Sequence, residues 1–109
     1  MEHFIVDMQT EKSKKYYIIR EEVSQEIVLH PSQYLMHKMR AKGSPNTIKR
    51  SALVISYYLN YLSENQLTME DVWNMKYEKH HEHFTDFLIW LKAGMHSKDE
   101  YTKKPYNET

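Results

Sequence analysis

Cations and small hydroxyl or amide side chains gather between positions 38 and 50, and these residue types bind phosphate. Lysine and arginine form charge-assisted hydrogen bonds with phosphate oxygens, while serine, threonine and asparagine add neutral donors. Such a set suits the reversible binding of a polyanion. The candidate contacts are Lys38, Arg40, Lys42, Ser44, Asn46, Thr47, Lys49 and Arg50.

The start of a helix stands in the middle of this cluster. Ser44 is a good N-cap residue, and Pro45 suits the first helical position, where no backbone N–H is needed. Apolar side chains then recur every three or four positions, which predicts a helix of about five turns over 44–62. Because the first N–H groups of a helix have no partner, Lys49 and Arg50 beside them favour a phosphate site.

The formal net charge of the 109 residues is zero, but the charges are spread unevenly. Residues 31–66 carry five basic residues and one acid, Glu64, which gives a formal charge of +4. The first thirty residues carry six acids and four bases. A basic middle beside an acidic segment is a localised electrostatic footprint, which favours nucleic acid as the partner.

The stretch His80-His81-Glu82-His83 holds the densest set of possible metal ligands. Zinc-binding helices place two histidines four residues apart on one face, whereas His80 and His83 are three apart. No third ligand is evident, and the stretch opens an amphipathic helix. We therefore expect a solvated helix face, no metal site and no cofactor.

The composition excludes several classes of function. The chain has no cysteine, so it forms neither a disulfide framework nor a thiolate zinc site. Its two glycines stand at predicted helix ends, which excludes a Gly-rich phosphate loop, and no nucleophile elbow is present. There is no apolar run of 18 residues and no secretory signal pattern. We expect a cytoplasmic protein with no membrane span and no catalytic site of its own.

Two short β-prone runs, 4–6 and 16–19, flank a polar stretch over 7–15. This pattern predicts an N-terminal β-hairpin with a loose loop. A short third strand over 26–29 is a second possibility. Since two strands alone are marginally stable, we expect them to pack on the helices or to be loosely held.

Three further helices are expected beside the one over 44–62. The first covers about 31–41 and stops at Gly43, a residue suited to a left-handed cap. The next is short, reaches about Met75 and opens with Thr68 and Asp71 in the positions of a capping box.

The fourth helix is expected over about 78–93, with Gly94 as its cap. Its apolar residues follow the i, i+3, i+4, i+7 spacing of one buried face. The residues of this face are Phe84, Phe87, Leu88 and Leu91.

Several motifs follow one another in a familiar order. The run Ser44-Pro45-Asn46-Thr47-Ile48 is followed by Ile55, Tyr58 and the pair Tyr61-Leu62. This series resembles the N-terminal core-binding domain of tyrosine recombinases, the phage-type integrases. That family shows S-x-N-T-[IL], a leucine eight residues after the threonine, an aromatic three later, and an aromatic–leucine pair.

The resemblance extends over about 32–94. The junction Lys42-Gly43, the helix start over 67–72 and the apolar helix around 87–91 also resemble the family pattern. One position departs from it, because Ser51 stands where the family often has tyrosine or arginine.

The resemblance implies a mainly α fold, a four-helix SAM-like orthogonal bundle preceded here by the β-hairpin. Residues 1–29 would form the hairpin extension, 30–95 the core-binding domain, and 96–109 a linker towards a catalytic domain that this chain lacks. The implied function is to clamp duplex DNA for site-specific integration or recombination. The implied partners are double-stranded DNA and, in the full-length protein, other recombinase protomers; the isolated domain is expected to be a monomer and no enzyme.

Two alternatives come from other classes of protein. A helical protein-interaction module would use its apolar stripe and tyrosines to bind a partner, and its cations would be ordinary surface. A stand-alone helix-turn-helix regulator would place its turn at Gly43. The second helix is long and apolar in its middle, which suits a core helix better than a recognition helix.

Overall fold

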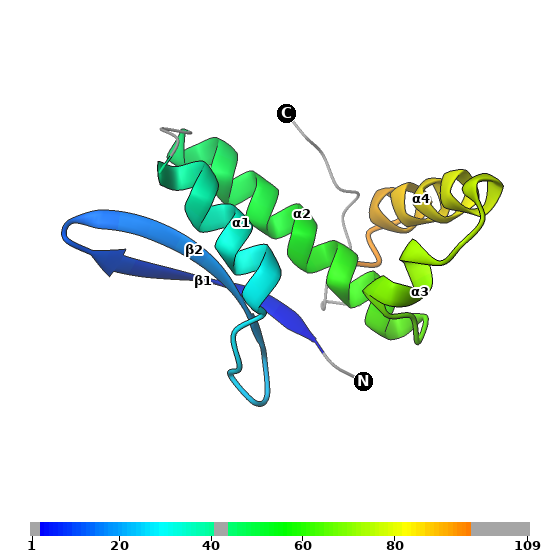
Figure 1. Cartoon of the computed structure of the whole chain (residues 1–109), viewed down its shortest axis with the longest axis horizontal. Helices are drawn as coiled ribbons and strands as arrows, with labels where there is room; N and C mark the ends of the chain where they lie inside the picture. The colour runs from blue at the N-terminus through cyan, green and yellow to red at the C-terminus, as the bar shows by residue number, and fades with distance from the viewer. Residues whose placement is uncertain (1–2, 41–43, 97–109) are drawn as a thin grey trace. The chain divides into compact units, whose positions relative to one another are not determined.

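The structure is a computed structural model that describes residues 3–40 and 44–96 (Figure 1). Over these residues the chain forms a two-stranded antiparallel hairpin followed by four helices, in the predicted order. The predicted contact at Lys42 and the predicted helix stop at Gly43 lie outside the described residues, and so does the predicted linker beyond His96. The elements are β1 (Phe4–Glu11), β2 (Lys14–Glu21), α1 (Leu29–Arg40), α2 (Pro45–Glu64), α3 (Met69–Trp73) and α4 (Tyr77–Lys92).

The chain divides into two compact units, Met1–Asn60 and Tyr61–Thr109. The first unit holds the hairpin, α1 and most of α2, and the second holds the last turn of α2 with α3 and α4. The predicted domain boundaries, after residues 29 and 95, stay a prediction. No helix in the described residues is long and apolar enough to cross a membrane.

The hairpin is longer and tighter than predicted. Its strands pair in register from Phe4 with Glu21 to Glu11 with Lys14, so most of the expected loose loop is strand. The turn consists of Lys12 and Ser13, whose φ angles of 50° and 66° are both left-handed. Two left-handed residues match the twist of paired strands. The loose-loop prediction is therefore wrong, because backbone pairing extends the strands through residues whose side chains are polar.

The possible third strand over 26–29 does not form. Within the described residues Ile27 makes only an isolated bridge to Arg20. The Val28 N–H also donates to the Ile19 carbonyl at 2.8 Å, after which the chain enters α1. The connection therefore ties the end of the hairpin to the first helix without extending the sheet.

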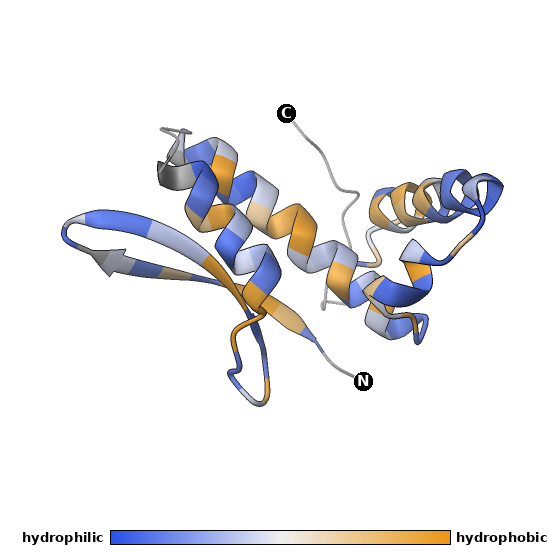
Figure 2. Ribbon diagram, viewed as in Figure 1, coloured by the Kyte–Doolittle hydropathy of each residue, from blue (hydrophilic) through white to orange (hydrophobic). Residues whose placement is uncertain are grey.

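The core of the first unit lies where β2, α1 and α2 meet (Figure 2). Ile19 and Leu35 are the most completely buried large side chains, with 0% and 1% of their surface exposed. Tyr17 and Ile19 share one face of β2 because side chains alternate along a strand. The predicted stripe of α2 is confirmed, with Ile48 and Ala52 buried in this core and Ile55 and Leu59 packed against it, so the hairpin and the helices share one core.

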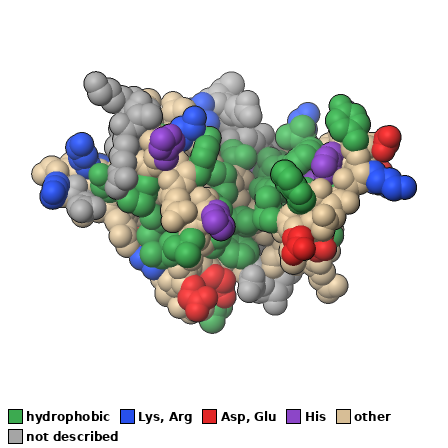
Figure 3. Space-filling model, viewed as in Figure 1, with side chains coloured by type: hydrophobic (Ala, Val, Ile, Leu, Met, Phe, Trp, Pro, Cys, Tyr) green, Lys and Arg blue, Asp and Glu red, His purple; other side chains and the backbone are tan. Residues whose placement is uncertain are grey.

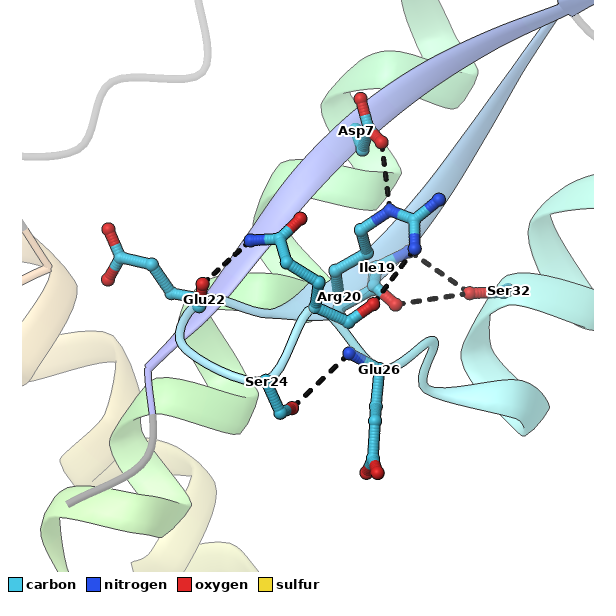
Figure 4. Close-up of polar contacts among 8 residues, drawn as sticks. Asp7, Ile19, Arg20, Glu22, Ser24, Glu26 and Ser32 are labelled. Carbon is cyan, nitrogen blue, oxygen red and sulfur yellow. Dashed lines mark hydrogen bonds and ion pairs between the residues drawn. The ribbon is translucent and has the colours of Figure 1, made fainter.

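Polar contacts fix the hairpin to the loop and to α1 (Figure 4). The Ser32 hydroxyl accepts a hydrogen bond from the Ile19 N–H at 3.0 Å. Arg20 donates through Nε to Asp7 Oδ2 and through Nη1 to the Gln25 carbonyl, both at 2.9 Å. Further bonds within the loop join Gln25 to Glu22 and Glu26 to Ser24.

A second polar contact ties the beginning of β1 to α2. The Asn60 amide accepts a hydrogen bond from the Phe4 N–H and donates one to the Phe4 carbonyl. Asn60 has only 8% of its surface exposed, and both bonds are part-buried. One side chain thus satisfies both backbone groups of a residue 56 positions away.

The two helices of the first unit begin close to the predicted positions. α1 starts at Leu29, so Pro31 stands within its first turn, where its missing N–H costs nothing. The Ile48 N–H donates to the Ser44 carbonyl at 3.0 Å, which gives Ser44 the place of the N-cap residue before Pro45. The predicted start of the second helix is confirmed.

The helix ends of the second unit follow the predicted signals. The Thr68 hydroxyl accepts from the Asp71 N–H at 3.1 Å, and the Asp71 carboxylate accepts from the Thr68 N–H at 2.8 Å, so the capping box is present. Gly94 has a φ of 76° after α4, and the Met95 N–H bonds back to the Trp90 carbonyl. These features form a Schellman cap.

The buried face of α4 differs from the predicted one. Phe87 and Leu91 are buried as expected, but Phe84 and Leu88 have 46% and 54% of their surface exposed. His83 is buried in their place, with 7% exposed. The buried residues are thus four apart, 83, 87 and 91. The prediction is wrong for Phe84 and Leu88, because periodicity leaves the rotation of a helix about its axis open when apolar residues flank the face on both sides.

Candidate nucleic-acid interface

A hollow of about 200 Å³ lies between α1 and α2 in the first unit. Leu35 and Ile48 from the core form part of its lining. Two of the predicted contact residues, Lys38 on α1 and Thr47 on α2, meet at this hollow. The fold therefore brings together a cation and a hydroxyl from two helices. The complete lining is Tyr34, Leu35, Lys38, Thr47, Ile48 and Ser51.

Lys38 is held beside the hollow by an aromatic ring. Its Nζ lies 5.5 Å from the centroid of the Tyr34 ring, within the range of a cation–π contact. Such a contact at an exposed site contributes about 0.5–1 kcal/mol, which orients the ammonium group and leaves it exposed to a ligand. Tyr34 was not among the predicted site residues, although it stands one helical turn before Lys38.

The predicted residues of α2 are all exposed, but they do not share one face. Successive residues turn by about 100° around a helix, so Lys49 points about 160° away from Thr47. Asn46 and Arg50 are four residues apart and share a third direction. The start of α2 thus presents these polar groups over an arc of about 160°, just under half of its circumference, with Ser44 at the cap.

Ser51 lines the hollow next to Thr47. Its place departs from the resemblance, where a larger residue often stands, and the smaller side chain leaves the hollow open. The Lys42 prediction lies outside the described residues, and so does the side chain of Arg40 at the end of α1. Their contribution to this surface stays a prediction.

The hairpin turn adds cations that the sequence analysis missed. In Figure 1 the turn of the hairpin, the end of α1 and the start of α2 lie towards the same end of the first unit. The lysines of the turn are exposed. Lysines at three of four consecutive positions are a signal, but the loose hairpin loop that the sequence predicts does not place them beside the helices. The basic end is defined here as Lys12, Lys14, Lys15, Lys38, Lys49 and Arg50.

Three acids of the first unit lie away from the basic end. Glu21, Glu22 and Glu26 belong to the end of β2 and the loop before α1. On the face drawn in Figure 3, Lys and Arg side chains lie over the end of the hairpin and acidic side chains over this loop. Arg20, which directly precedes Glu21, is paired with Asp7 at 2.9 Å. Glu11, which pairs in register with Lys14, stands at the basic end, so the separation of charge in the first unit is partial.

The histidine-rich stretch takes no part in this interface and belongs to the second unit. The prediction of a solvated face holds for His81 and Glu82, which are exposed, but is wrong for His83. His80 Nε2 lies 2.7 Å from the Val72 carbonyl oxygen. Among the residues that the structure describes, no three His, Asp or Glu side chains are placed to hold a metal ion.

No family model matches this chain, and no curated protein or solved structure shows a significant similarity to it. What the basic end binds is therefore inferred from its own residues and their geometry.

Proposed function

We propose that this chain binds double-stranded DNA through the basic end of its first unit, in the manner of the core-binding domain of a tyrosine recombinase. The observation that carries the proposal is the hollow between α1 and α2, where Lys38 and Thr47 meet beside an exposed helix start. Cations, a hydroxyl and free helix N–H groups together bind phosphate better than any of them alone.

The first unit also has the charge that such a role needs. Met1–Asn60 contains nine basic and six acidic residues, a formal charge of +3. In the proposed complex Lys38, Thr47 and Lys49 contact phosphates and fix the position of the duplex, while Asn46 and Arg50 reach towards a groove. The hairpin lysines extend the same positive surface.

The assignment to the recombinase family is part of the proposal. It is supported by the S-P-N-T-I motif at the start of α2, by the order of four helices, and by the capped helix at Thr68. We propose that the helices correspond to the SAM-like bundle of that family. In this proposal a separate catalytic domain supplies the strand cleavage, other protomers assemble on the DNA, and this chain alone binds weakly as a monomer in the cytoplasm.

A titration of a fluorescein-labelled duplex at two salt concentrations tests the proposal. If about six phosphate contacts form, the logarithm of the binding constant should fall with the logarithm of salt with a slope of about −5. The variant Lys49→Glu with Arg50→Glu should lose binding, because each change replaces an attraction by a repulsion.

The matched control is Lys76→Glu with Lys92→Glu, which makes the same change of charge in the second unit. It should bind like the parent chain. Absence of binding at low salt, or equal binding by the two double variants, would contradict the proposal. Circular dichroism of each variant checks that the helices are retained.

A protein-interaction module is the second candidate, and one observation favours it. Trp73 and Tyr77 have 83% and 85% of their surface exposed, and Leu88 is exposed on α4. Large apolar side chains at the surface of the second unit are typical of protein interfaces. In that case Leu88→Lys should abolish partner binding while the duplex titration shows no binding by any variant.

A further inference from the structure

A pocket of about 300 Å³ lies entirely within the second unit. The last turn of α2, the residues that follow it, and α4 contribute its walls. Its apolar part is formed by Leu67 and Met75. This volume is at the lower end of the range for small-molecule sites and is large enough for one long side chain.

Two buried aromatic rings line one side of this pocket. Tyr61 and His83 have 8% and 7% of their surface exposed, and their ring centroids lie 5.7 Å apart. Tyr61 is held from behind by Phe87 and Trp90, at 5.4 Å and 5.5 Å between centroids. A ring held on several sides keeps its position when a ligand enters, so the pocket is preorganised.

The pocket carries more negative than positive charge. Its charged lining consists of Glu82, Asp86 and Lys79. Lys79 Nζ lies 3.3 Å from Glu82, an exposed pair of little energetic worth. Burial lowers the pKa of His83 from its ordinary value, Asp86 opposes this effect and His80 adds to it. The ring is therefore neutral at pH 7, and the pocket has a formal charge of −1.

Asp86 is close enough to both rings to act on their ionisation. Burial raises the pKa of Tyr61 first, and the charge of Asp86 raises it further. The same carboxylate raises the pKa of His83 against the larger effect of burial. An acidic side chain beside aromatic rings and apolar side chains suits a ligand that carries a cation at the end of an alkyl chain.

We propose that this pocket binds the cationic side chain of an arginine or lysine presented by a partner protein. The alkyl stem packs against Leu67 and Met75, and the cation lies between the Asp86 carboxylate and the Tyr61 ring. This function is independent of DNA binding, because a negative pocket repels phosphate. The partner is therefore recognised through a basic side chain, whatever the first unit binds.

The direct test is an NMR titration of the ¹⁵N-labelled chain with N-acetyl-arginine amide. Saturable shifts should appear in the amides of 61–67 and 79–86, with a dissociation constant on the order of 1 mM for so small a ligand. The citrulline analogue has the same shape without the charge and should bind at least about fivefold more weakly. N-acetyl-lysine amide tests the other basic side chain.

Two variants and a control locate the charge. Asp86→Asn should weaken arginine amide binding at least about fivefold, and Lys79→Met should strengthen it, because the loss of a cation from the lining makes the pocket more negative. Glu70→Gln, an exposed acid on α3 outside the pocket, should leave binding unchanged.

Three results would overturn the proposal. The first is that the citrulline analogue binds as tightly as arginine amide, and the second is that Asp86→Asn binds arginine amide as well as the parent chain does. The third is that no amide signal shifts when the concentration of arginine amide is about 50 times the expected dissociation constant. If Asp86→Asn loses binding only because it misfolds, Lys79→Met still tests the proposal. That variant is expected to bind arginine amide more tightly, and misfolding does not produce tighter binding.

Discussion

The two units of this chain have opposite charges and opposite kinds of surface. Met1–Asn60 has a formal charge of +3, whereas Tyr61–Thr109 has six basic and nine acidic residues and a charge of −3. The first unit presents cations around a helix start, and the second presents a negative aromatic pocket with exposed apolar side chains beside it. A net charge of zero therefore conceals two surfaces that suit different partners.

The units also differ in how they are held together. In the first, hydrogen bonds join residues far apart in the sequence, such as Asn60 with Phe4. In the second, the polar bonds at helix ends are local, buried distant contacts are aromatic, such as Tyr61 with Phe87, and the distant bond from Trp90 Nε1 to Glu64 is exposed. A hydrogen bond is lost when its two groups move apart by a small distance. Aromatic packing depends on buried area and tolerates larger shifts of the rings.

Leu35→Ala should have the largest effect. Leu35 is 1% exposed in the core of the first unit, and its truncation should lower the free energy of unfolding by about 2–5 kcal/mol. Amide exchange should accelerate in β2 and α1. Because Trp73 and Trp90 both belong to the second unit, tryptophan fluorescence reports the other half of the chain.

Leu91→Ala is the mirror experiment in the second unit, where Leu91 is 3% exposed. It should change the tryptophan signal first. If both variants accelerate exchange equally throughout the chain, the units are one cooperative structure and the contrast fails.

Asn60→Ala should come next, because it leaves both backbone groups of Phe4 without their partner. We expect a loss of about 1–3 kcal/mol and faster amide exchange at the start of β1. Asn65→Ala is the matched control, since that amide makes a local, part-buried bond to the Tyr61 carbonyl at 2.8 Å. If both variants lower the free energy of unfolding equally, the bond between β1 and α2 contributes no more to stability than a local hydrogen bond does.

The pH dependence should single out the second unit. Burial lowers the pKa of His83, so folding favours the neutral ring, and the unfolded chain takes up the proton first as the pH falls. Stability should be full above the ordinary pKa of 6.5 and decline below it, until the folded-state pKa is reached. One group contributes a slope of at most about 1.4 kcal/mol per pH unit.

His83→Phe keeps an aromatic ring and removes the titration, so unfolding followed by tryptophan fluorescence should lose this part of its pH dependence. His96 also has a pKa lowered by burial, and His96→Phe separates its share. An unchanged pH profile in both variants would contradict the assignment.

Single lysines of the basic end should give the smallest effect. Lys38→Ala or Lys15→Ala should each make the salt slope of DNA binding shallower by about 1, while Lys92→Ala in the second unit should not change it. If Lys38 alters the slope and Lys15 does not, the hairpin turn is outside the interface and the basic end is confined to the two helices.

Local signals in the sequence predicted the helices well. Ser44-Pro45, the capping box at Thr68 and Gly94 each act within one helical turn, and each stands where expected. The apolar stripe of α2 is also buried as predicted, because its repeat is regular over several turns. The caps and the spacing of the stripe depend on neighbouring residues only.

The candidate site was predictable in part. All the polar residues of α2 that were chosen are exposed, and Lys38 does meet Thr47 across the hollow. The sequence could not show that Lys49 points away from Thr47, nor that the hairpin lysines lie at the same end. Those facts depend on where a strand turns and on how two helices pack.

The order of the elements, the ends of the described helices and the uneven distribution of charge follow from the amino-acid sequence, because caps, periodicity and charge are local properties. The tertiary structure alone decided that the hairpin turns tightly at Lys12-Ser13, that His83 is buried while Phe84 is exposed, and that a negative pocket forms against Tyr61. The reason is physical: burial and backbone pairing are set by residues distant in the chain, which no local pattern records.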